Sequence, residues 1–340
     1  MDLRELLGLA RCRRRLAVGA VATLALAALA VVFLPGTVAD SAEKLAGADR
    51  RWLLLALAGF LASAVSSAGI WHEGMAAAGR RASLADACAR YGVGSLVNSF
   101  TPGRLGELAR VALFSQTVPE EGRGWATGGG VAAIVAARAV AMAVALCAAA
   151  AFGAVPVWVV GTLLAIGAAG FVAAVAARHR VQSSRLERLL APFRALGNDP
   201  KRSARLVAWA LAAAAARVVA LAATAAAVGV PSAFVVALIL LPALDLASVI
   251  VVTPGNVGIS SGMTAVALAS HGVALPLGLT AGLAVHAAET AVGICFGLVG
   301  TLALAPVPPP VRTRLALSAT AAISAAAFLA IALTLRPDLV

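Results

Sequence analysis

Runs of about twenty consecutive apolar residues recur along the whole chain. They cover residues 16–34, 52–70, 125–151, 156–177, 205–229, 232–252, 275–304 and 315–335. The hydrocarbon core of a bilayer is about 30 Å thick, and a helix of about 20 residues crosses it. Because 61% of the 340 residues are hydrophobic and only 12% are charged, an ordinary soluble fold is excluded. The sequence predicts an all-α, polytopic integral membrane helical bundle.

Two further stretches, 84–118 and 253–272, have intermediate polarity. Each can cross the membrane, or enter it and return as a pair of re-entrant half-helices. The predicted number of spans is therefore eight or nine. The first apolar run, 16–34, is long enough to span the bilayer, so we expect it to be retained rather than cleaved as a signal peptide.

The distribution of Arg and Lys predicts which connections face the cytoplasm. The N-terminus carries five arginines before residue 16, and residues 178–204 hold seven basic side chains against two acidic ones. By the positive-inside rule both lie in the cytoplasm, as expected for a bacterial-type inner-membrane protein. Residues 305–314 carry two arginines and no acid, so they also face inward, which requires 253–272 to cross and gives nine spans.

We expect one transmembrane domain over residues 1–340. Its first half covers about 1–177, the basic cytoplasmic loop 178–204 follows, and the second half covers about 205–340.

The sequence Thr-Pro-Gly-x-x-Gly occurs twice, at Thr101–Gly106 and Thr253–Gly258. Pro ends the helix before it, and Gly permits a sharp backbone turn. A new helix starting at Arg104 or Asn256 would present free N–H groups and a positive dipole end at the turn. Paired broken helices in two halves of a chain indicate a substrate site in transporters. The alternative is two ordinary turns at the membrane surface.

The first copy is followed by charged residues at helical spacing. Arg104, Glu107 and Arg110 lie at positions i, i+3 and i+6 and share one helix face. An arginine beside free backbone N–H groups can hold a phosphate. A solvated helix face is the alternative interpretation.

These motifs resemble those of a known family. The pattern Asn98-x-x-x-Pro102-Gly-Arg-x-Gly-Glu107-x-x-Arg110, with the later Pro254-Gly-x-x-Gly258, is similar to the transmembrane region of lysylphosphatidylglycerol synthases and related flippase-like proteins. The resemblance implies a polytopic helical fold with membrane-dipping segments, and the movement or handling of anionic lipids.

The chain departs from the family pattern in two ways. The lysine-transfer activity of the synthases belongs to a separate soluble domain, so we do not expect that activity here. A carboxylate common after the second motif is also missing, because the chain reads Gly258-Ile-Ser-Ser-Gly262. Any role assigned to that carboxylate does not carry over.

Four ionisable residues lie inside predicted spans: Arg138, Arg217, Asp245 and Glu289. A charge at the bilayer centre costs about 2.5–3.5 kcal/mol on insertion scales, so each should find a partner or face water. Pairing of an arginine with Asp245 or Glu289 is the simplest arrangement. The pairs can serve an anion path or only fix helix packing. His286, one turn before Glu289, can relay protons or bond a neighbouring helix.

The remaining observations favour a lipid-handling protein without enzymatic activity. The sequence has no metal-ligand spacing and no P-loop, dinucleotide or HExxH motif, so we expect no cofactor and no metal. The basic loop lacks interleaved aromatic residues, which argues against nucleic-acid binding. The expected partners are anionic membrane lipids. The alternatives are a non-transporting scaffold for a lipid-using membrane enzyme and an ion-coupled transporter of a small solute.

The predicted lipid head-group site combines both motifs with the intramembrane arginines, and Asp245 and Glu289 are the predicted charge partners. Its members are Asn98, Pro102, Gly103, Arg104, Gly106, Glu107, Arg110, Arg138, Arg217, Pro254, Gly255, Asn256 and Gly258.

Overall fold

The structure, a computed structural model, describes residues 47–79, 83–101, 105–119, 123–178, 184–247 and 257–305. Within these ranges all regular structure is helical and no β-strand occurs. The predicted all-α membrane bundle is confirmed. The expected spans 16–34 and 315–335 lie outside the described residues.

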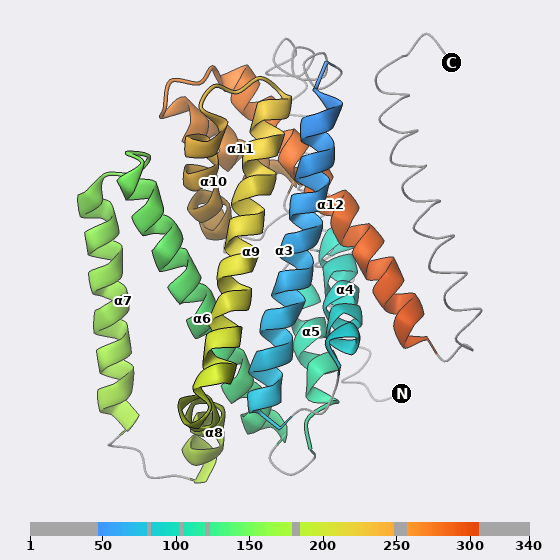
Figure 1. Cartoon of the computed structure of the whole chain (residues 1–340), viewed down its shortest axis with the longest axis vertical. Coiled ribbons are helices and arrows are strands. Elements are labelled where there is room, and N and C mark those ends of the chain that lie inside the picture. Colours follow the sequence, from blue (N-terminus) through green and yellow to red (C-terminus); the bar gives the residue numbers. More distant parts are fainter. Residues whose placement is uncertain are drawn as a thin grey trace, which may run out of the picture.

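Four described helices are long and apolar enough to cross a membrane: α3 (Arg50–Ala77), α6 (Arg123–Ala151), α9 (Pro200–Ala227) and α12 (Leu275–Leu304). A fifth long helix, α7 (Val157–Arg178), lies beside α6 at the edge of the bundle (Figure 1). These helices coincide with the predicted spans. Asp49 and Asp199 begin α3 and α9 by accepting hydrogen bonds from the N–H groups of Arg51 and Arg202.

The stretch 84–118 forms a re-entrant hairpin. Helix α4 (Leu84–Phe100) ends just before Thr101, and α5 (Leu105–Ser115) runs back. Arg90, near the start of α4, donates a 2.7 Å hydrogen bond to the carbonyl of Leu113 near the end of α5, so both outer ends lie together. At about 1.5 Å per residue neither arm reaches the about 30 Å needed to cross. The re-entrant alternative is confirmed here.

A second hairpin is formed by α10 (Ala233–Ala247) and α11 (Val257–Ala269), which is the described part of the stretch 253–272. Both outer ends meet the turn after α6. The ring of Phe234 lies 5.4 Å from that of Phe152, and Nε2 of His271 lies 3.1 Å from the carbonyl oxygen of Ala154.

The described parts of these two helices are 15 and 13 residues long. The expected spans at 232–252 and 253–272 include residues 248–256, which lie outside the described residues. Because a hairpin returns to the side it entered, just as two crossings would, every connection keeps its predicted side.

The two hairpins enter the bundle from opposite ends. Helices α3 and α9 are antiparallel, since the N–H of Asp49 donates a 3.0 Å bond to the carbonyl of Ala227, while Glu73 pairs with Arg205 at the other end, also at 3.0 Å. In Figure 1, α4 and α5 enter from the lower end and α10 and α11 from the upper end. The order long helix, hairpin, long helix therefore occurs twice with inverted direction, as in transporters built from inverted repeats.

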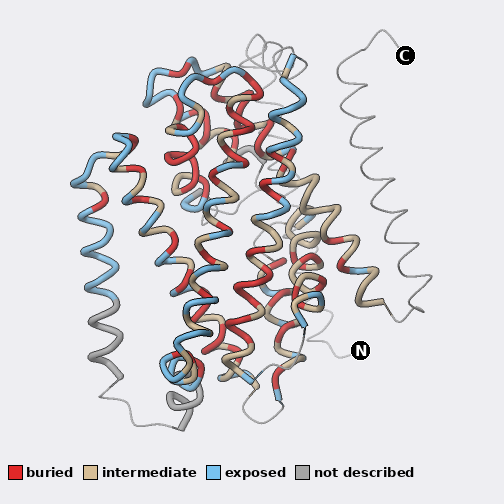
Figure 2. The backbone as a smooth tube through the Cα atoms, viewed as in Figure 1, coloured by how far each residue is buried: buried red, intermediate tan, exposed pale blue. Residues whose placement is uncertain are grey.

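Two hydrophobic clusters hold the bundle together, one near each end (Figure 2). The upper cluster centres on α10 and includes Leu221, Leu240 and Leu268. The lower cluster includes Phe114 and Ile134, and the Phe114 ring stacks on Trp71 at 4.8 Å. The space between the clusters is where polar side chains gather.

The basic connection 178–204 contains a helix, α8 (Ser184–Asn198), which packs beside α6. Leu196 of α8 is buried in the lower cluster. The sequence analysis treated this stretch as a loop because its mean hydropathy is low. Its leucines nevertheless give one face of the segment an apolar surface to bury, so it folds as a helix at the end of the bundle.

Candidate functional site

A polar cavity of about 650 Å³ lies between the two hydrophobic clusters. Its wall takes Ile70 and Ala210 from the lower cluster, and Leu241 and Leu244 from the upper one. Both hairpins and the helices α3, α6, α9 and α12 contribute to it. The polar lining consists of Ser63, Ser67, Tyr91, Ser95, Asn98, Ser99, Thr101, Glu107, Arg110, Arg138, Arg217, Asp245, Ser260, His286, Glu289 and Thr290.

The cavity brings together most of the predicted site that the structure describes. Asn98, Glu107, Arg110, Arg138, Arg217, Asp245 and Glu289 all line it. Gly106 and Gly258 lie near the starts of α5 and α11, next to the turns of the two hairpins. The remaining predicted residues, Pro102, Gly103, Arg104, Pro254, Gly255 and Asn256, lie outside the described residues.

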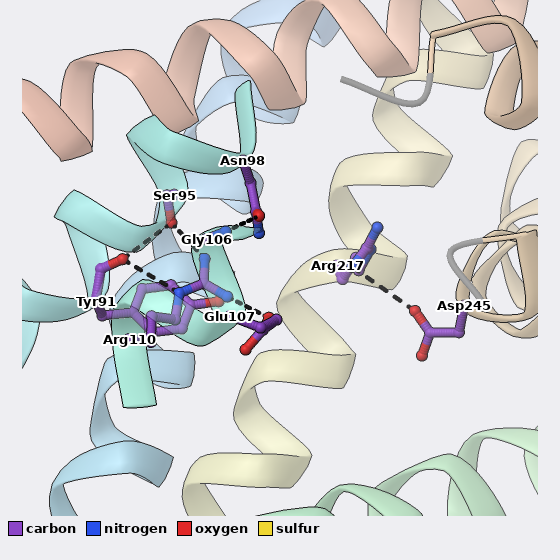
Figure 3. Close-up of polar contacts among 8 residues, drawn as sticks. All are labelled: Tyr91, Ser95, Asn98, Gly106, Glu107, Arg110, Arg217 and Asp245. Carbon is purple, nitrogen blue, oxygen red and sulfur yellow. Dashed lines mark hydrogen bonds and ion pairs between the residues drawn. The ribbon is translucent and has the colours of Figure 1, made fainter. Parts of the chain in front are cut away.

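Arg110 is the most buried of the cavity arginines, with its side chain 6% exposed. Its guanidinium forms an ion pair with Glu107, donates a 2.8 Å hydrogen bond to Oγ of Ser95, and lies 4.0 Å from the centre of the Tyr91 ring (Figure 3). Cation–π and ion-pair contacts are strengthened where water is excluded. The arrangement fixes α5 against α4, so the solvated-face interpretation of this motif is wrong for Arg110.

Asn98 connects the two arms of the first hairpin across its turn. Its side-chain oxygen accepts a 2.8 Å hydrogen bond from the N–H of Gly106, the second residue of α5 (Figure 3). This satisfies one of the free N–H groups at the start of that helix. The arms are so close that a Cβ at Gly106 would overlap the carbonyl of Gly94 and the Asn98 amide. Glycine at 106 is therefore required by the close approach of the two helices.

Arg217 of α9 joins the second hairpin to α12. Its Nη2 lies 2.9 and 3.2 Å from the two carboxylate oxygens of Glu289. Its Nη1 lies 3.8 Å from Oδ1 of Asp245, the contact that Figure 3 shows. The predicted pairing of an intramembrane arginine with these acids is confirmed for Arg217. One guanidinium is thus shared by two carboxylates.

Arg138 differs from the other two arginines of the cavity. It projects from α6 into the lining, and within the described ranges no carboxylate lies at ion-pair distance from it. A buried or half-buried cation without a carboxylate favours the presence of an anion or water beside it. Arg138 is therefore the cavity position best suited to an incoming anionic group.

The sequence analysis identified His286 of the cavity wall, but not Tyr91 and Ser95. His286 lies between Oγ of Ser260 on α11 and Oγ1 of Thr290, at 3.5 and 3.2 Å from its two ring nitrogens. Tyr91 and Ser95 hold Arg110 as described above. These side chains carry no charge, so the available signal was the spacing of polar residues along α4, where Tyr91, Ser95, Asn98 and Ser99 recur at helical intervals.

Residues 16–297 match the model of a protein family described as the lysylphosphatidylglycerol synthase TM region. The chain belongs to this family. The matched segment contains every residue of the predicted site and both hairpins. As a member of the family, the protein is a multi-pass membrane protein related to lipid handling. No curated protein and no solved structure matches the chain.

Proposed function

We propose that the protein translocates an anionic phospholipid across the bacterial inner membrane, without chemically altering it, by passing the head group through the polar cavity. The observation that carries this proposal is Arg138, a cation without a described carboxylate partner in a cavity of about 650 Å³ inside a membrane bundle. A phosphodiester head group is an anion that a guanidinium binds through charge-assisted hydrogen bonds. The acyl chains would remain in lipid outside the bundle.

The cavity wall also carries hydroxyl groups whose oxygens face the same space as Arg138. Ser63 and Ser67 of α3 and the hydroxyls of α4 line it. Serine hydroxyls bind phosphate and glycerol oxygens without adding charge. These hydroxyl groups replace part of the water that the head group loses when it enters the cavity. Because they are uncharged, they bind the head group less tightly than a second cation without a carboxylate partner would, so the lipid can leave again.

The test is lipid exchange in liposomes that contain the purified protein and a trace of tail-labelled phosphatidylglycerol. A quencher that cannot cross the membrane reports the fraction of label in the outer leaflet. Wild-type protein should expose label from both leaflets within the assay, whereas empty liposomes should expose only the outer half. Arg138→Ala should slow exchange at least tenfold, the equivalent of about 1.4 kcal/mol.

The matched control is Arg194→Ala, which removes an exposed arginine of α8 that does not line the cavity. It should exchange lipid like the wild type. If Arg138→Ala exchanges lipid as fast as Arg194→Ala while both proteins remain folded, Arg138 does not bind the head group.

A scaffold for a lipid-using membrane enzyme is the second candidate function, and α7 favours it. Every residue of α7 from 161 to 170 is exposed, including Ile166 at 64%. A helix with so little contact to its own bundle can bind another membrane protein or lie in lipid. A folded protein that exchanges no lipid but co-purifies with one membrane enzyme, and loses that enzyme on Ile166→Ser, would favour the scaffold.

A further inference from the structure

We infer that the head group accepted by the cavity is a polyol phosphate, in which the phosphate carries a glycerol or a sugar-like ring with several hydroxyl groups. This inference rests on the proposed lipid translocation and names its substrate class. The observations behind it are the direction in which the wall hydroxyls donate their protons and the pairing of the wall carboxylates.

Hydroxyl groups of the cavity wall donate their protons to backbone carbonyls. Oγ of Ser99 and Oγ1 of Thr101 each donate to the carbonyl one turn earlier on α4, at 3.1 and 2.6 Å. Oγ of Ser63 on α3 donates to the carbonyl of Ala213 on α9, at 3.0 Å. A hydroxyl has one proton and two acceptor lone pairs. With the proton engaged, these three side chains offer acceptors to a ligand in the cavity.

Ser95 shows how such a hydroxyl binds a donor. Its Oγ donates to the carbonyl of Tyr91 at 3.2 Å and accepts a 2.8 Å hydrogen bond from Nη2 of Arg110. Ser99, one turn further along α4, has the same bond to the helix backbone. Among the residues that the structure describes, no side chain donates to Oγ of Ser99, so its donor has to come from a ligand or from water.

The carboxylates of the described wall also have acceptor capacity left. Glu107 pairs with Arg110, and Asp245 and Glu289 both contact Arg217. The three acidic side chains nevertheless remain 36–47% exposed. A carboxylate has about four lone-pair sites, so contact with one arginine leaves room for hydroxyl donors.

Paired carboxylates favour hydroxyl groups over an amine as the donors. Each carboxylate of the described wall already contacts an arginine, so an ammonium would have to compete with a guanidinium for it. A hydroxyl is neutral and needs only a spare lone pair. The wall is therefore better matched to a polyol than to an amine-bearing head group.

The phosphate and the polyol would contact different helices. Arg138, the arginine suited to the phosphate, belongs to α6, whereas the hydroxyl and carboxylate acceptors come from α3, α4, α5, α10 and α12. At about 30 Å³ for each water-sized group, a cavity of about 650 Å³ holds about twenty non-hydrogen atoms. A phosphoglycerol group or a phosphorylated sugar ring fits this space, with the acyl chains outside.

The experiment compares two tail-labelled lipids that differ only in the hydroxyl groups of the head, phosphatidylglycerol and phosphatidylpropanol. Both have a three-carbon head and one negative charge. Their exchange is measured in the liposome assay, and the passive exchange in empty liposomes is subtracted. The wild type should exchange phosphatidylglycerol about tenfold faster, which corresponds to one or two hydrogen bonds.

Two further lipids separate the possible head groups. Phosphatidylinositol carries a ring with hydroxyl groups and should also exchange faster than phosphatidylpropanol. A higher rate for phosphatidylinositol than for phosphatidylglycerol would assign the cavity to a ring polyol, and the opposite order would assign it to glycerol. Phosphatidylserine carries an amine on an anionic head and should be as slow as phosphatidylpropanol.

Ser99→Ala and Ser63→Ala test the wall acceptors through the ratio of the two rates. Each should lower the ratio of phosphatidylglycerol to phosphatidylpropanol exchange by about threefold and leave the phosphatidylpropanol rate unchanged. A merely structural defect would slow both lipids alike. The matched control is Ser115→Ala, because Ser115 has a similar 2.8 Å bond to a backbone carbonyl but is exposed and does not line the cavity.

The outcomes separate the substrate class from the lipid path. Equal exchange of phosphatidylglycerol and phosphatidylpropanol by folded wild-type protein overturns the polyol and leaves the lipid path standing. Faster exchange of phosphatidylserine than of phosphatidylglycerol overturns it in favour of an amine. An unchanged ratio in both serine variants overturns the assigned acceptors. Absence of exchange for all four lipids removes the proposed lipid path, and the substrate class with it.

Discussion

Arg110 and Arg138 are both arginines of one cavity wall, yet their surroundings give them different roles. Arg110 is held by Glu107, Ser95 and the ring of Tyr91, so its donors are engaged within its own hairpin. Arg138 has no such set of partners among the described residues. The first arginine stabilises the site, and the second is available to a ligand.

Charged residues of the site are predictable from sequence, and their partners are not. An ionisable residue in an apolar run is conspicuous, because its insertion is costly, and this identified Arg138, Arg217, Asp245 and Glu289. That Arg217 rather than Arg138 meets both acids depends on the packing of α9 against α10 and α12. Hydropathy contains no information on that packing.

Replacement of Asn98 should loosen the turn of the first hairpin. Asn98→Ala leaves the N–H of Gly106 without its acceptor and should lower the free energy of unfolding by about 1 kcal/mol. Asn98→Asp retains an acceptor beside the helix N-terminus and should lower it less. Thermal unfolding in detergent, followed by circular dichroism, measures both. Equal unfolding temperatures for Asn98→Ala and the wild type would show that the hydrogen bond contributes nothing.

At the scale of helices, the break after α4 was predictable from the sequence. Thr-Pro-Gly marks the end of α4, which stops at Phe100, and α5 is described from Leu105 onward, next to the predicted start at Arg104. The run 232–252 contains no comparable signal, and α10 continues through Pro242. A continuous apolar run predicts a full span, and the structure describes the part of this run up to Ala247 as a helix.

Close packing within the first hairpin makes Gly106 sensitive to a single methyl group. Gly106→Ala places a Cβ against the backbone of Gly94, so α5 must move away from α4. Overpacking of this kind costs about 1–3 kcal/mol, and we expect a lower unfolding temperature together with slower lipid exchange. Detergent unfolding and the liposome assay measure the two effects.

Gly161→Ala is the matched control, because a Cβ at Gly161 of α7 meets nothing within 4 Å. Its stability should stay unchanged or rise by up to about 1 kcal/mol, since Ala favours a helix more than Gly does. If Gly106→Ala is as stable as Gly161→Ala, the arms of the hairpin are less closely packed than the structure indicates.

For the whole molecule, the inverted hairpins explain why a polar cavity exists in the middle of an apolar bundle. Helix α4 ends beside the cavity between the two hydrophobic clusters, and free backbone groups must be satisfied there. Polar side chains such as Asn98 meet that need and also line the cavity. From the sequence, only the repeated motif could be recognised. The end of the bundle from which each hairpin enters depends on how α3 packs against α9, and the motif does not contain that information.

The inverted arrangement predicts which positions share a side of the membrane. Gln116 follows the first hairpin, and Asn198 ends α8; both lie at the end of the bundle where α9 begins, whereas Ser270 lies at the opposite end beside the turn after α6. With the native cysteines replaced by Ala, single cysteines at 116 and 198 should be protected from a membrane-impermeant maleimide in intact cells. A cysteine at 270 should react, and all three should react in opened membranes. The reactivity of the cysteine at 116 tests whether 84–118 is a re-entrant hairpin. If this stretch crossed the membrane instead, residue 116 would lie on the same side as Ser270, and its cysteine would react in intact cells.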